Sequence, residues 1–315
     1  MFKLNHFLKM DIHLAHTQGF CAGVSSAIEV VNRAIAKYGP PIYVRHHIVH
    51  NTKVIADFEA IGVVFIEELS EVPEGGKVIF SAHGVAPNIY EEAQERHLIF
   101  IDATCPLVTK VHREATAFSK KNIQTILIGH KGHQELVGTA GFVRPDLLHV
   151  IETDGDIDAL QLDPEQPIGC LTQTTLSVTD TAVLIKKLKE KYPNILFPPK
   201  EDICFATQNR QNAVIELAQF CDLILICGSP HSSNSNRLKE TALAQGVLSE
   251  IIDTEHELNI NWLEGKSTIG ISSGASVPRA IVDAVVAKIQ AHCLVTNIYQ
   301  KDSVEKNISF SVPKV

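Results

Sequence analysis

The stretch LILICGSPHSSNSNRL, residues 223–238, contains the pattern that decides the fold: an apolar run, a turn of small and polar residues, and a helix-like segment. TILIGHKGH, residues 125–133, and VIFSAHGV, residues 78–85, likewise run from an apolar stretch into a small-residue turn with histidine. A buried strand followed by a polar loop and a helix is the repeating step of parallel βαβ units. The sequence therefore predicts an α/β protein.

A second apolar run with a polar end follows each of these stretches: IFIDATCP (99–106), PIGCLTQTT (167–175) and STIGISSGAS (267–276). The recurrence, at intervals of roughly one hundred residues or less, indicates three copies of one small α/β module. Ligands of parallel sheets bind beyond the carboxyl ends of the strands. We therefore expect the six polar loops to line one central cleft.

The alternation of apolar and helical segments also predicts individual elements and domains. The predicted strands are 12–15, 42–44, 78–81, 99–102, 125–128, 147–151, 168–171, 223–227 and 268–271. The predicted helices are 25–38, 88–95, 109–121, 178–191, 209–220 and 279–290. The predicted domains are 23–105, 106–200, 1–22 with 201–290, and a C-terminal covering arm over 291–315, where ISFSVP (308–313) resembles an edge strand or an arm.

Composition excludes several classes of protein. The chain has 315 residues, a net charge of −8 and 6% aromatic residues, so we expect no nucleic-acid partner. No apolar run approaches the roughly 18 residues of a membrane span, and MFKLNHFLKMD is too short and polar for a signal or transit peptide. Seven cysteines argue against a secreted disulfide framework, so the expected location is the cytoplasm.

Three of the cysteines stand where an apolar stretch gives way to a helix-like one: Cys21 in GFCAGV, Cys105 in DATCPLVTKVH and Cys204 in EDICFATQNR. Their wide spacing suggests one ligand from each of three similar modules. A metal or iron–sulfur cluster held by three thiolates keeps one coordination position open for substrate chemistry.

The nature of this centre is not decided by cysteine spacing. The chain has no CxxC motif, which excludes compact ferredoxin-like runs but leaves a closed structural zinc site, with three cysteines and a histidine, as an alternative. The remaining cysteines are expected to be small buried hydrophobic residues: Cys170, Cys221, Cys227 and Cys293.

Hydroxyl- and amide-rich loops predict a phosphate site. Gly228–Leu238 combines Ser and Asn side chains with the start of a helix, and Gly270–Pro278 and Leu171–Ser177 offer similar donors. No Walker or GxGxxG pattern is present, so nucleotide binding is not indicated. Because these loops contain few lysines or arginines, they suit a small diphosphate held by neutral donors, histidines and helix ends.

Glu135 follows His133 by two residues, at the start of a predicted helix. An exposed helical glutamate is the ordinary interpretation, whereas in a cleft beside His133 and a cluster it becomes a proton donor. His50, in YVRHHIVHN, either reaches the same cleft or caps a strand.

Taken together, nine ordered motifs resemble the 4-hydroxy-3-methylbut-2-enyl diphosphate reductase family from about Leu14 to Pro278. The motifs are GFCAGV, YVRHHIVHN, FSAHGV, DATCPLVTKVH, LIGHKGHQE, TQTTLSV, EDICFATQNRQ, SSNSNRL and SSGASVP. The resemblance implies three α/β domains in a trefoil around one 4Fe-4S cluster. It implies that Cys21, Cys105 and Cys204 hold this cluster and that its open iron site takes the hydroxyl of the substrate.

The resemblance also implies roles for further residues. Glu135, Thr174 and His133 are implied as catalytic residues, with Glu135 and Thr174 managing the proton. The implied substrate-binding residues are His50, His83, His133, Thr174, Ser232, Ser233, Asn234 and Ser276. The implied reaction ends the methylerythritol phosphate route to isoprenoids and yields isopentenyl and dimethylallyl diphosphates.

The implied electrons come from an external one-electron donor such as ferredoxin or flavodoxin, since the chain has no flavin or nicotinamide fingerprint. No membrane partner is implied. The sequence departs from the family pattern at Pro230 and His231 and in an N-terminal extension of about nine residues. Two alternatives stay open: a non-catalytic three-cysteine cluster or zinc protein that binds an acidic ligand, and a phosphatase or lyase with the same phosphate loops.

Overall fold

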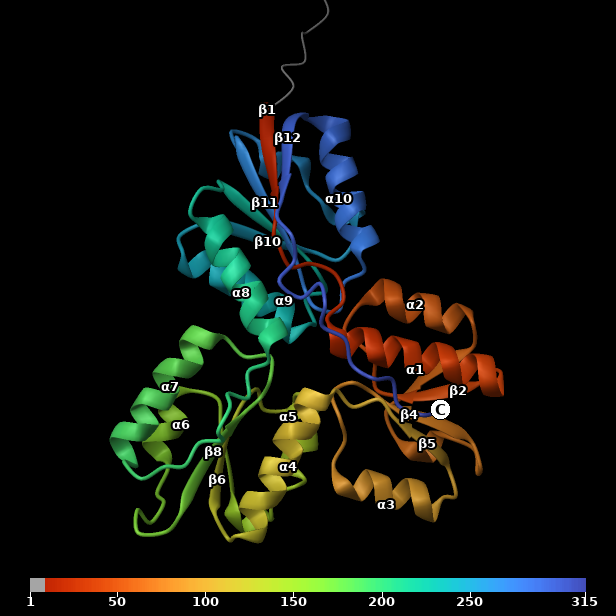
Figure 1. The fold of residues 1–315 in the computed structure, drawn as a ribbon, viewed down its shortest axis with the longest axis vertical. Coiled ribbons are helices and arrows are strands. Elements are labelled where there is room, and N and C mark those ends of the chain that lie inside the picture. Colours follow the sequence, from red (N-terminus) through yellow and green to blue (C-terminus); the bar gives the residue numbers. More distant parts are fainter. Residues whose placement is uncertain (1–8) are drawn as a thin grey trace, which may run out of the picture. The chain divides into compact units, whose positions relative to one another are not determined.

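The computed structural model describes residues 9–315, which form three parallel β-sheets with helices packed on them (Figure 1). The fold class predicted from the sequence, α/β, is therefore confirmed. The opening segment MFKLNHFL (1–8), part of the stretch interpreted above as neither signal nor transit peptide and of the predicted third domain, lies outside the described residues. None of the helices formed by residues 9–315 is long and apolar enough to cross a membrane.

The chain divides into two compact units. Unit 1 comprises the N-terminal residues up to Cys21, His50–Val54 and Phe205–Ile308. Unit 2 comprises Ala22–Val49, Ile55–Cys204 and Ser309–Val315. The division into three domains stays a prediction.

Unit 1 is built on one five-stranded sheet in the order β10-β9-β11-β1-β12, with all strands parallel. Its strands are β1 (Lys9–Leu14), β9 (Leu223–Cys227), β10 (Leu248–Ile252), β11 (Thr268–Ser273) and β12 (Leu294–Gln300). Its helices are α8 (Phe205–Ala218), α9 (Ser233–Ala244), α10 (Arg279–His292) and two short 3-10 helices, Glu255–Glu257 and Ile260–Leu263.

Both faces of this sheet are covered, which explains the unbroken apolar run of β9. Ile224 and Ile226 pack with α8 and α9 on one face. Leu223 and Leu225 pack with α10 on the other, as Figure 1 shows for the helices. The polar residues that follow the apolar runs in the sequence lie in the loops at the carboxyl ends of β9 and β11.

Unit 2 contains two parallel sheets, in the orders β3-β2-β4-β5 and β7-β6-β8. Their strands are β2 (Ile42–Arg45), β3 (Val63–Ile66), β4 (Lys77–Phe80), β5 (Ile99–Asp102), β6 (Gln124–Ile128), β7 (Leu148–Ile151) and β8 (Ile168–Thr172). The helices are α1 (Ala22–Tyr38), α2 (Thr52–Ala60, whose first residues count with unit 1), α3 (Pro87–Glu95), α4 (Pro106–Lys120), α5 (Gln134–Ala140), α6 (Asp154–Ala159) and α7 (Val178–Lys191). Short 3-10 helices cover Leu69–Glu71 and Pro145–Leu147.

Helix α4 follows β5 in the chain but packs on the other sheet of unit 2. Its residues Val111 and Ala115 share a core with Leu127 of β6 and Leu171 of β8. The opposite face of that sheet is covered by α7, whose Leu188 packs with Ile126 and other apolar side chains.

The sheet orders change which strands correspond to one another in the three repeated modules. VIFSAHGV (β4) is not equivalent to TILIGHKGH (β6) and LILICGSPH (β9). Strands β6 and β9 lie next to the edge strands β7 and β10, whereas β4 lies one position further along its sheet, between β2 and β5. Its equivalents are the strands of PIGCLTQTT (β8) and STIGISSGAS (β11), whereas β2 takes the place of β6 and β9. Likewise β5, the strand of IFIDATCP, takes the place of β1 beside β11. A histidine after an apolar run had suggested the wrong pairing.

The C-terminal region differs from one alternative raised by the sequence. The edge strand is β12, at Leu294–Gln300, and it pairs in parallel with β1. Residues 308–313 (ISFSVP) have no regular secondary structure, so the edge-strand interpretation of that segment is wrong. The apolar residues of this short segment pointed to a strand, but a strand also needs a neighbouring edge to pair with, and residues 308–313 pair with none of the described strands.

Candidate functional site

The three loop-edge cysteines share one backbone arrangement. In each case the cysteine N–H donates a hydrogen bond to the second residue beyond the end of an equivalent strand: β11, β4 or β8. The bonds join Cys21 to Ala275 O (3.0 Å), Cys105 to Ala82 O (3.0 Å) and Cys204 to Thr174 O (3.1 Å). The threefold repeat of the sequence is therefore also a repeat of the cysteine environment.

Each of these cysteines also stands directly before a helix. Helix α1 begins after Cys21, α4 after Cys105 and α8 after Cys204. All three are thiols outside disulfides and are partly exposed. Because a helix N-terminus carries partial positive charge, the three positions suit an anionic, thiolate-bound group. The donor set therefore fits an iron–sulfur cluster.

The other four cysteines are buried, as predicted. Burial raises the pKa of Cys221 and of Cys227 to about 12, and it raises the pKa of Cys170 and of Cys293 as well. These side chains stay protonated at neutral pH and pack as small hydrophobic residues.

The meeting of the three thiols stays a prediction. Cys21 belongs to unit 1, whereas Cys105 and Cys204 belong to unit 2. Within residues 9–315, no three His, Cys, Asp or Glu side chains form a group that could hold a metal ion.

Glu135 is a buried acid and not the exposed helical glutamate of the ordinary interpretation. Only 3% of the residue is exposed. Its Oε1 accepts a hydrogen bond from Thr174 N at 2.6 Å, and its Oε2 accepts one from Thr174 Oγ1 at 2.9 Å. Burial raises the pKa of Glu135 to about 7, although the two bonds from Thr174 oppose the shift. This carboxyl group can therefore hold a proton near neutral pH.

In unit 2, His133 lies beside this acid, and the ring of His83 lies against that of His133. His133 is the N-cap of α5, and its Nδ1 accepts a hydrogen bond from Glu135 N at 3.2 Å. A neutral His133 therefore carries its proton on Nε2, which can donate to an anion. The rings of His83 and His133 stand 5.9 Å apart at 82°. Ser81 Oγ lies 3.2 Å from Nδ1 of His83 and helps to orient that ring.

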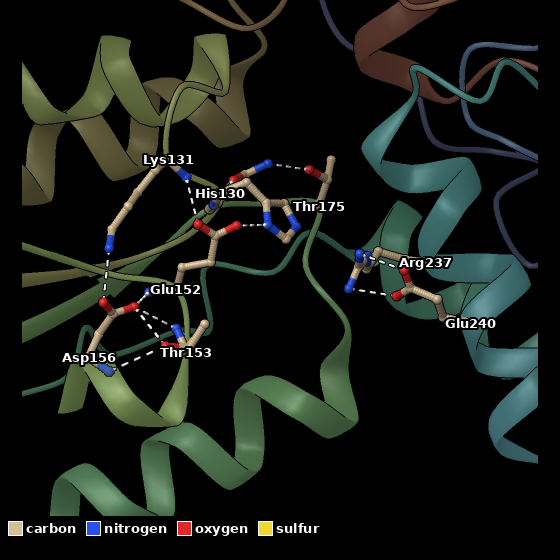
Figure 2. Close-up of polar contacts among 9 residues, drawn as sticks. His130, Lys131, Glu152, Thr153, Asp156, Thr175, Arg237 and Glu240 are labelled. Carbon is tan, nitrogen blue, oxygen red and sulfur yellow. Dashed lines mark hydrogen bonds and ion pairs between the residues drawn. The ribbon is translucent and has the colours of Figure 1, made fainter. Parts of the chain in front are cut away.

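The loop that carries His133 is held by contacts that the sequence did not indicate. Glu152 Oε1 lies 2.8 Å from His130 Nδ1, a contact drawn as a dashed line in Figure 2. Gln173 Oε1 accepts from His130 N at 3.1 Å, and Gln173 Nε2 donates to Thr175 Oγ1 at 2.9 Å. The loop after β8, which contains Thr174, is thereby tied to the loop between β6 and α5, which leads to Glu135.

Asp202, two residues before Cys204, is a second residue whose role the sequence did not indicate. The residue is 6% exposed and accepts hydrogen bonds from Thr172 N (3.0 Å) and Lys110 Nζ (2.8 Å). These bonds fix the chain immediately before Cys204 against β8 and α4.

In unit 1, the predicted phosphate loop forms the first turn of α9. Ser232 is the N-cap and accepts from Ser235 N at 3.3 Å. Asn234 is 6% exposed, and neither atom of its side-chain amide has a hydrogen-bond partner among the described residues. Ser276 Oγ donates to His50 O at 2.9 Å, which brings these two predicted residues together. A buried amide without partners costs roughly 1 to 3 kcal/mol, so this turn is suited to a polar ligand.

The predicted site residues are thus distributed over both units. Unit 1 holds Cys21, His50, Ser232, Ser233, Asn234 and Ser276. Unit 2 holds His83, Cys105, His133, Glu135, Thr174 and Cys204. The departures Pro230 and His231 lie between β9 and α9, where Asn236 Nδ2 donates to Pro230 O at 2.7 Å.

The first turn of α9 depends on two glycines. A Cβ atom added at Gly228 or Gly274 would lie 2.2 or 2.4 Å from Ser235 Oγ. Ser235 is fully buried, so its hydroxyl cannot turn toward solvent.

We therefore expect Gly274→Ala to destabilise the protein by roughly 1 to 3 kcal/mol and to displace the neighbouring Asn234. Thermal unfolding of the metal-free protein measures the first effect. Gly155→Ala on α6 is the matched control, because an added Cβ there meets only Thr153 Oγ1, at 3.8 Å. An unchanged midpoint for Gly274→Ala would show that the helix start is not tightly packed.

The fold and the local geometry define a class: a parallel α/β protein with three thiols at helix starts, a buried acid that can hold a proton near neutral pH, and a buried amide at the start of α9. The chain belongs to the LytB family, whose sequence model (LytB protein) matches residues 12–290.

Several relatives are similar over nearly their whole length. The chain is 49% identical to the 4-hydroxy-3-methylbut-2-enyl diphosphate reductase of Dechloromonas aromatica (strain RCB), over 97% of this chain and 99% of that protein. It is 50% identical to the reductase of the same name from Psychromonas ingrahamii, over 96% and 97%. The solved structure of the E-1-hydroxy-2-methyl-but-2-enyl-4-diphosphate reductase from Plasmodium falciparum matches with a TM-score of 0.94 at 38% identity, covering 97% of this chain and 96% of that one.

Proposed function

We propose that this protein reductively dehydroxylates 4-hydroxy-3-methylbut-2-enyl diphosphate to isopentenyl and dimethylallyl diphosphates, the last step of the methylerythritol phosphate pathway. The observation that carries the proposal is the buried Glu135 carboxyl, bonded to Thr174 beside His133. The names of the full-length relatives support the substrate. The balanced reaction consumes two electrons and two protons and releases one water.

The proposed cofactor is one 4Fe-4S cluster held by Cys21, Cys105 and Cys204, with one open iron site. The repeated backbone bonds and helix starts at these cysteines support it. A bound cluster would supply the electrons, one at a time, from an external donor such as ferredoxin or flavodoxin. A trefoil of three domains, in the cytoplasm, completes the proposal.

The diphosphate group is proposed to bind neutral donors. Asn234 contributes a buried amide, and Ser232 and Ser233 lie at the positive end of α9. Ser276 and His50, which contact each other, are proposed as further ligands. In unit 2, His83 and His133 complete the proposed set, His133 through Nε2.

The proton is proposed to pass from Glu135 through Thr174. When Glu135 is protonated on Oε2, the Thr174 hydroxyl can accept that proton and donate its own, since a hydroxyl is both donor and acceptor. The 2.9 Å separation of the two oxygens is a normal hydrogen-bond distance. The leaving hydroxyl would depart as water.

The pKa of Glu135 predicts how turnover depends on pH. The acid form is lost as the pH rises through about 7, because burial has raised the pKa to that value. We expect kcat to fall by about tenfold per pH unit above it, and this decline to disappear in Glu135→Gln. Measuring kcat between about pH 6 and pH 9 with an artificial reductant checks this. A flat wild-type profile would contradict the assignment.

The diphosphate ligands can be tested without turnover. We expect Asn234→Ala to weaken binding of the substrate and of inorganic diphosphate together, by roughly 1 to 3 kcal/mol, because one charge-assisted bond is lost. Calorimetry measures both affinities, and the absorption spectrum should stay unchanged. Unaltered diphosphate affinity would place the anion site elsewhere.

A spectroscopic experiment tests the function as a whole. Anaerobically purified protein should be brown, and after reduction it should be reoxidised when the substrate is added. A colourless protein that binds zinc would favour the non-catalytic alternative. Substrate-dependent phosphate release in air without iron would favour a phosphatase or lyase.

A further inference from the structure

Arg210, on α8 in unit 1, is the largest side chain that is fully buried among the described residues. Its Nη2 donates to Gly19 O at 2.9 Å, and its Nη1 donates to Ala206 O at 2.9 Å. The Ala206 contact lies within α8 and fixes the guanidinium group on that helix. The Gly19 contact reaches the loop that ends in Cys21.

The charge of Arg210 is balanced by one carboxylate from the C-terminal region. Both oxygens of Glu305 lie 3.1 Å from Arg210 Nη1, and the Glu305 side chain is 9% exposed. Asn209 Nδ2 also donates to Glu305 Oε1, at 3.1 Å. A buried guanidinium group needs such a partner, because the loss of one member leaves an uncompensated charge.

Gly19 is held from both sides. Its N–H donates to Ser273 Oγ at 3.0 Å, and its carbonyl accepts from Arg210. Its φ of +77° lies in the left-handed region that glycine tolerates best. The direction of the chain into Cys21 is therefore set by a left-handed glycine turn that two hydrogen bonds hold.

We propose that Arg210 and Glu305 form a positioning pair that holds the Gly19 turn and thereby presents the Cys21 thiol. The pair gives the region after β12 a role, since Glu305 comes from that region. Lysine cannot replace Arg210, because an ammonium group lacks the planar fork that reaches Gly19, Ala206 and Glu305 at once. The consequence for a cluster rests on the function proposed above, whereas the consequence for the thiol does not.

The test compares alkylation of individual cysteines by iodoacetamide in the full-length, metal-free protein, with peptide mass spectrometry. The variants are Glu305→Gln, which keeps the shape but not the charge, and Arg210→Lys. Lys306→Ala is the matched control, because the Lys306 side chain is 70% exposed and its ion pair with Asp302 is long, at 4.0 Å. Circular dichroism confirms that each variant is folded.

We expect Cys21 to react at least about threefold faster in both variants, with Cys105 in unit 2 unchanged and Lys306→Ala equal to wild type. An unchanged Cys21 rate, or an equal rise at Cys105, would overturn the positioning pair. In protein reconstituted with iron and sulfide, both variants should lose iron to a chelator faster than wild type. Wild-type protein that takes up no cluster would refute the proposed cofactor alone, because the alkylation result stands independently.

Discussion

Glu135→Gln should slow turnover at least about a hundredfold, because a positioned acid is typically worth a factor of roughly 10² to 10⁴. Glutamine keeps the size of the side chain, and its Oε1 can still accept from Thr174 N. Its Nε2 would donate to Thr174 Oγ1, in place of the bond that Glu135 Oε2 accepts from that hydroxyl. It has no acidic proton to give to the departing hydroxyl. Anaerobic kinetics with a strong artificial reductant measure the effect.

Two controls separate this loss from a structural one. The variant should keep its iron content and its absorption spectrum, and it should bind the substrate with nearly wild-type affinity. Glu165→Gln is a matched carboxylate change in the same unit, at an exposed residue. Near wild-type turnover of Glu135→Gln would show that the proton arrives by another route, such as His133.

Replacing Cys21, Cys105 or Cys204 with serine should remove or severely reduce bound iron. Each thiol has the same backbone anchor and the same helix start, so no one of them is dispensable in the proposed three-thiolate site. Iron and sulfide analysis after anaerobic reconstitution measures the loss.

Cys170→Ser and Cys293→Ser are the controls for this series. Both side chains are buried in packed cores, and burial raises the pKa of each thiol. Both variant proteins should retain iron at wild-type levels, apart from any loss of stability. Equal iron loss at all five positions would contradict the assignment of three ligands.

Much of the fold could be predicted because both faces of its sheets are buried. β9 and α7 have the predicted bounds, since an unbroken apolar run and a well-capped amphipathic helix are strong local signals. The strands β3, β10 and β12 were missed, and each of them lies at the edge of its sheet. The residues of β10 (LSEII) and β12 (LVTNIYQ) mix polar and apolar side chains, so their pairing with a neighbouring strand decides that they form. β3 (VVFI) is a short apolar run that the sequence could have indicated.

Helix α9 was recognised only at its start. Its segment SNSNRLKETALA is polar, and Ser and Asn favour caps over helix interiors. The helix is fixed by tertiary packing, in which Ser235 lies against Gly228 and Gly274. A close approach of this kind leaves no periodic pattern in the sequence, so the rest of the helix was not predicted.

The candidate site was predictable where chemistry follows strand ends and not where it depends on distant contacts. Cysteines, hydroxyls and histidines after apolar runs could be picked out directly. The contact of Glu152 with His130, the bonds of Asp202 and the pairing of Arg210 with Glu305 join residues far apart in the chain. The repeat register was misjudged for a similar reason, because the equivalence of β4 with β8 and β11 follows from sheet order alone.

The most direct measurement is product analysis by NMR after anaerobic turnover of 4-hydroxy-3-methylbut-2-enyl diphosphate in D₂O. The proposed function predicts isopentenyl and dimethylallyl diphosphates, each carrying one solvent-derived deuterium on carbon, with two electrons consumed per product. Substrate recovered unchanged by iron-loaded, reduced protein would contradict it, and so would an alcohol accompanied by free phosphate or diphosphate.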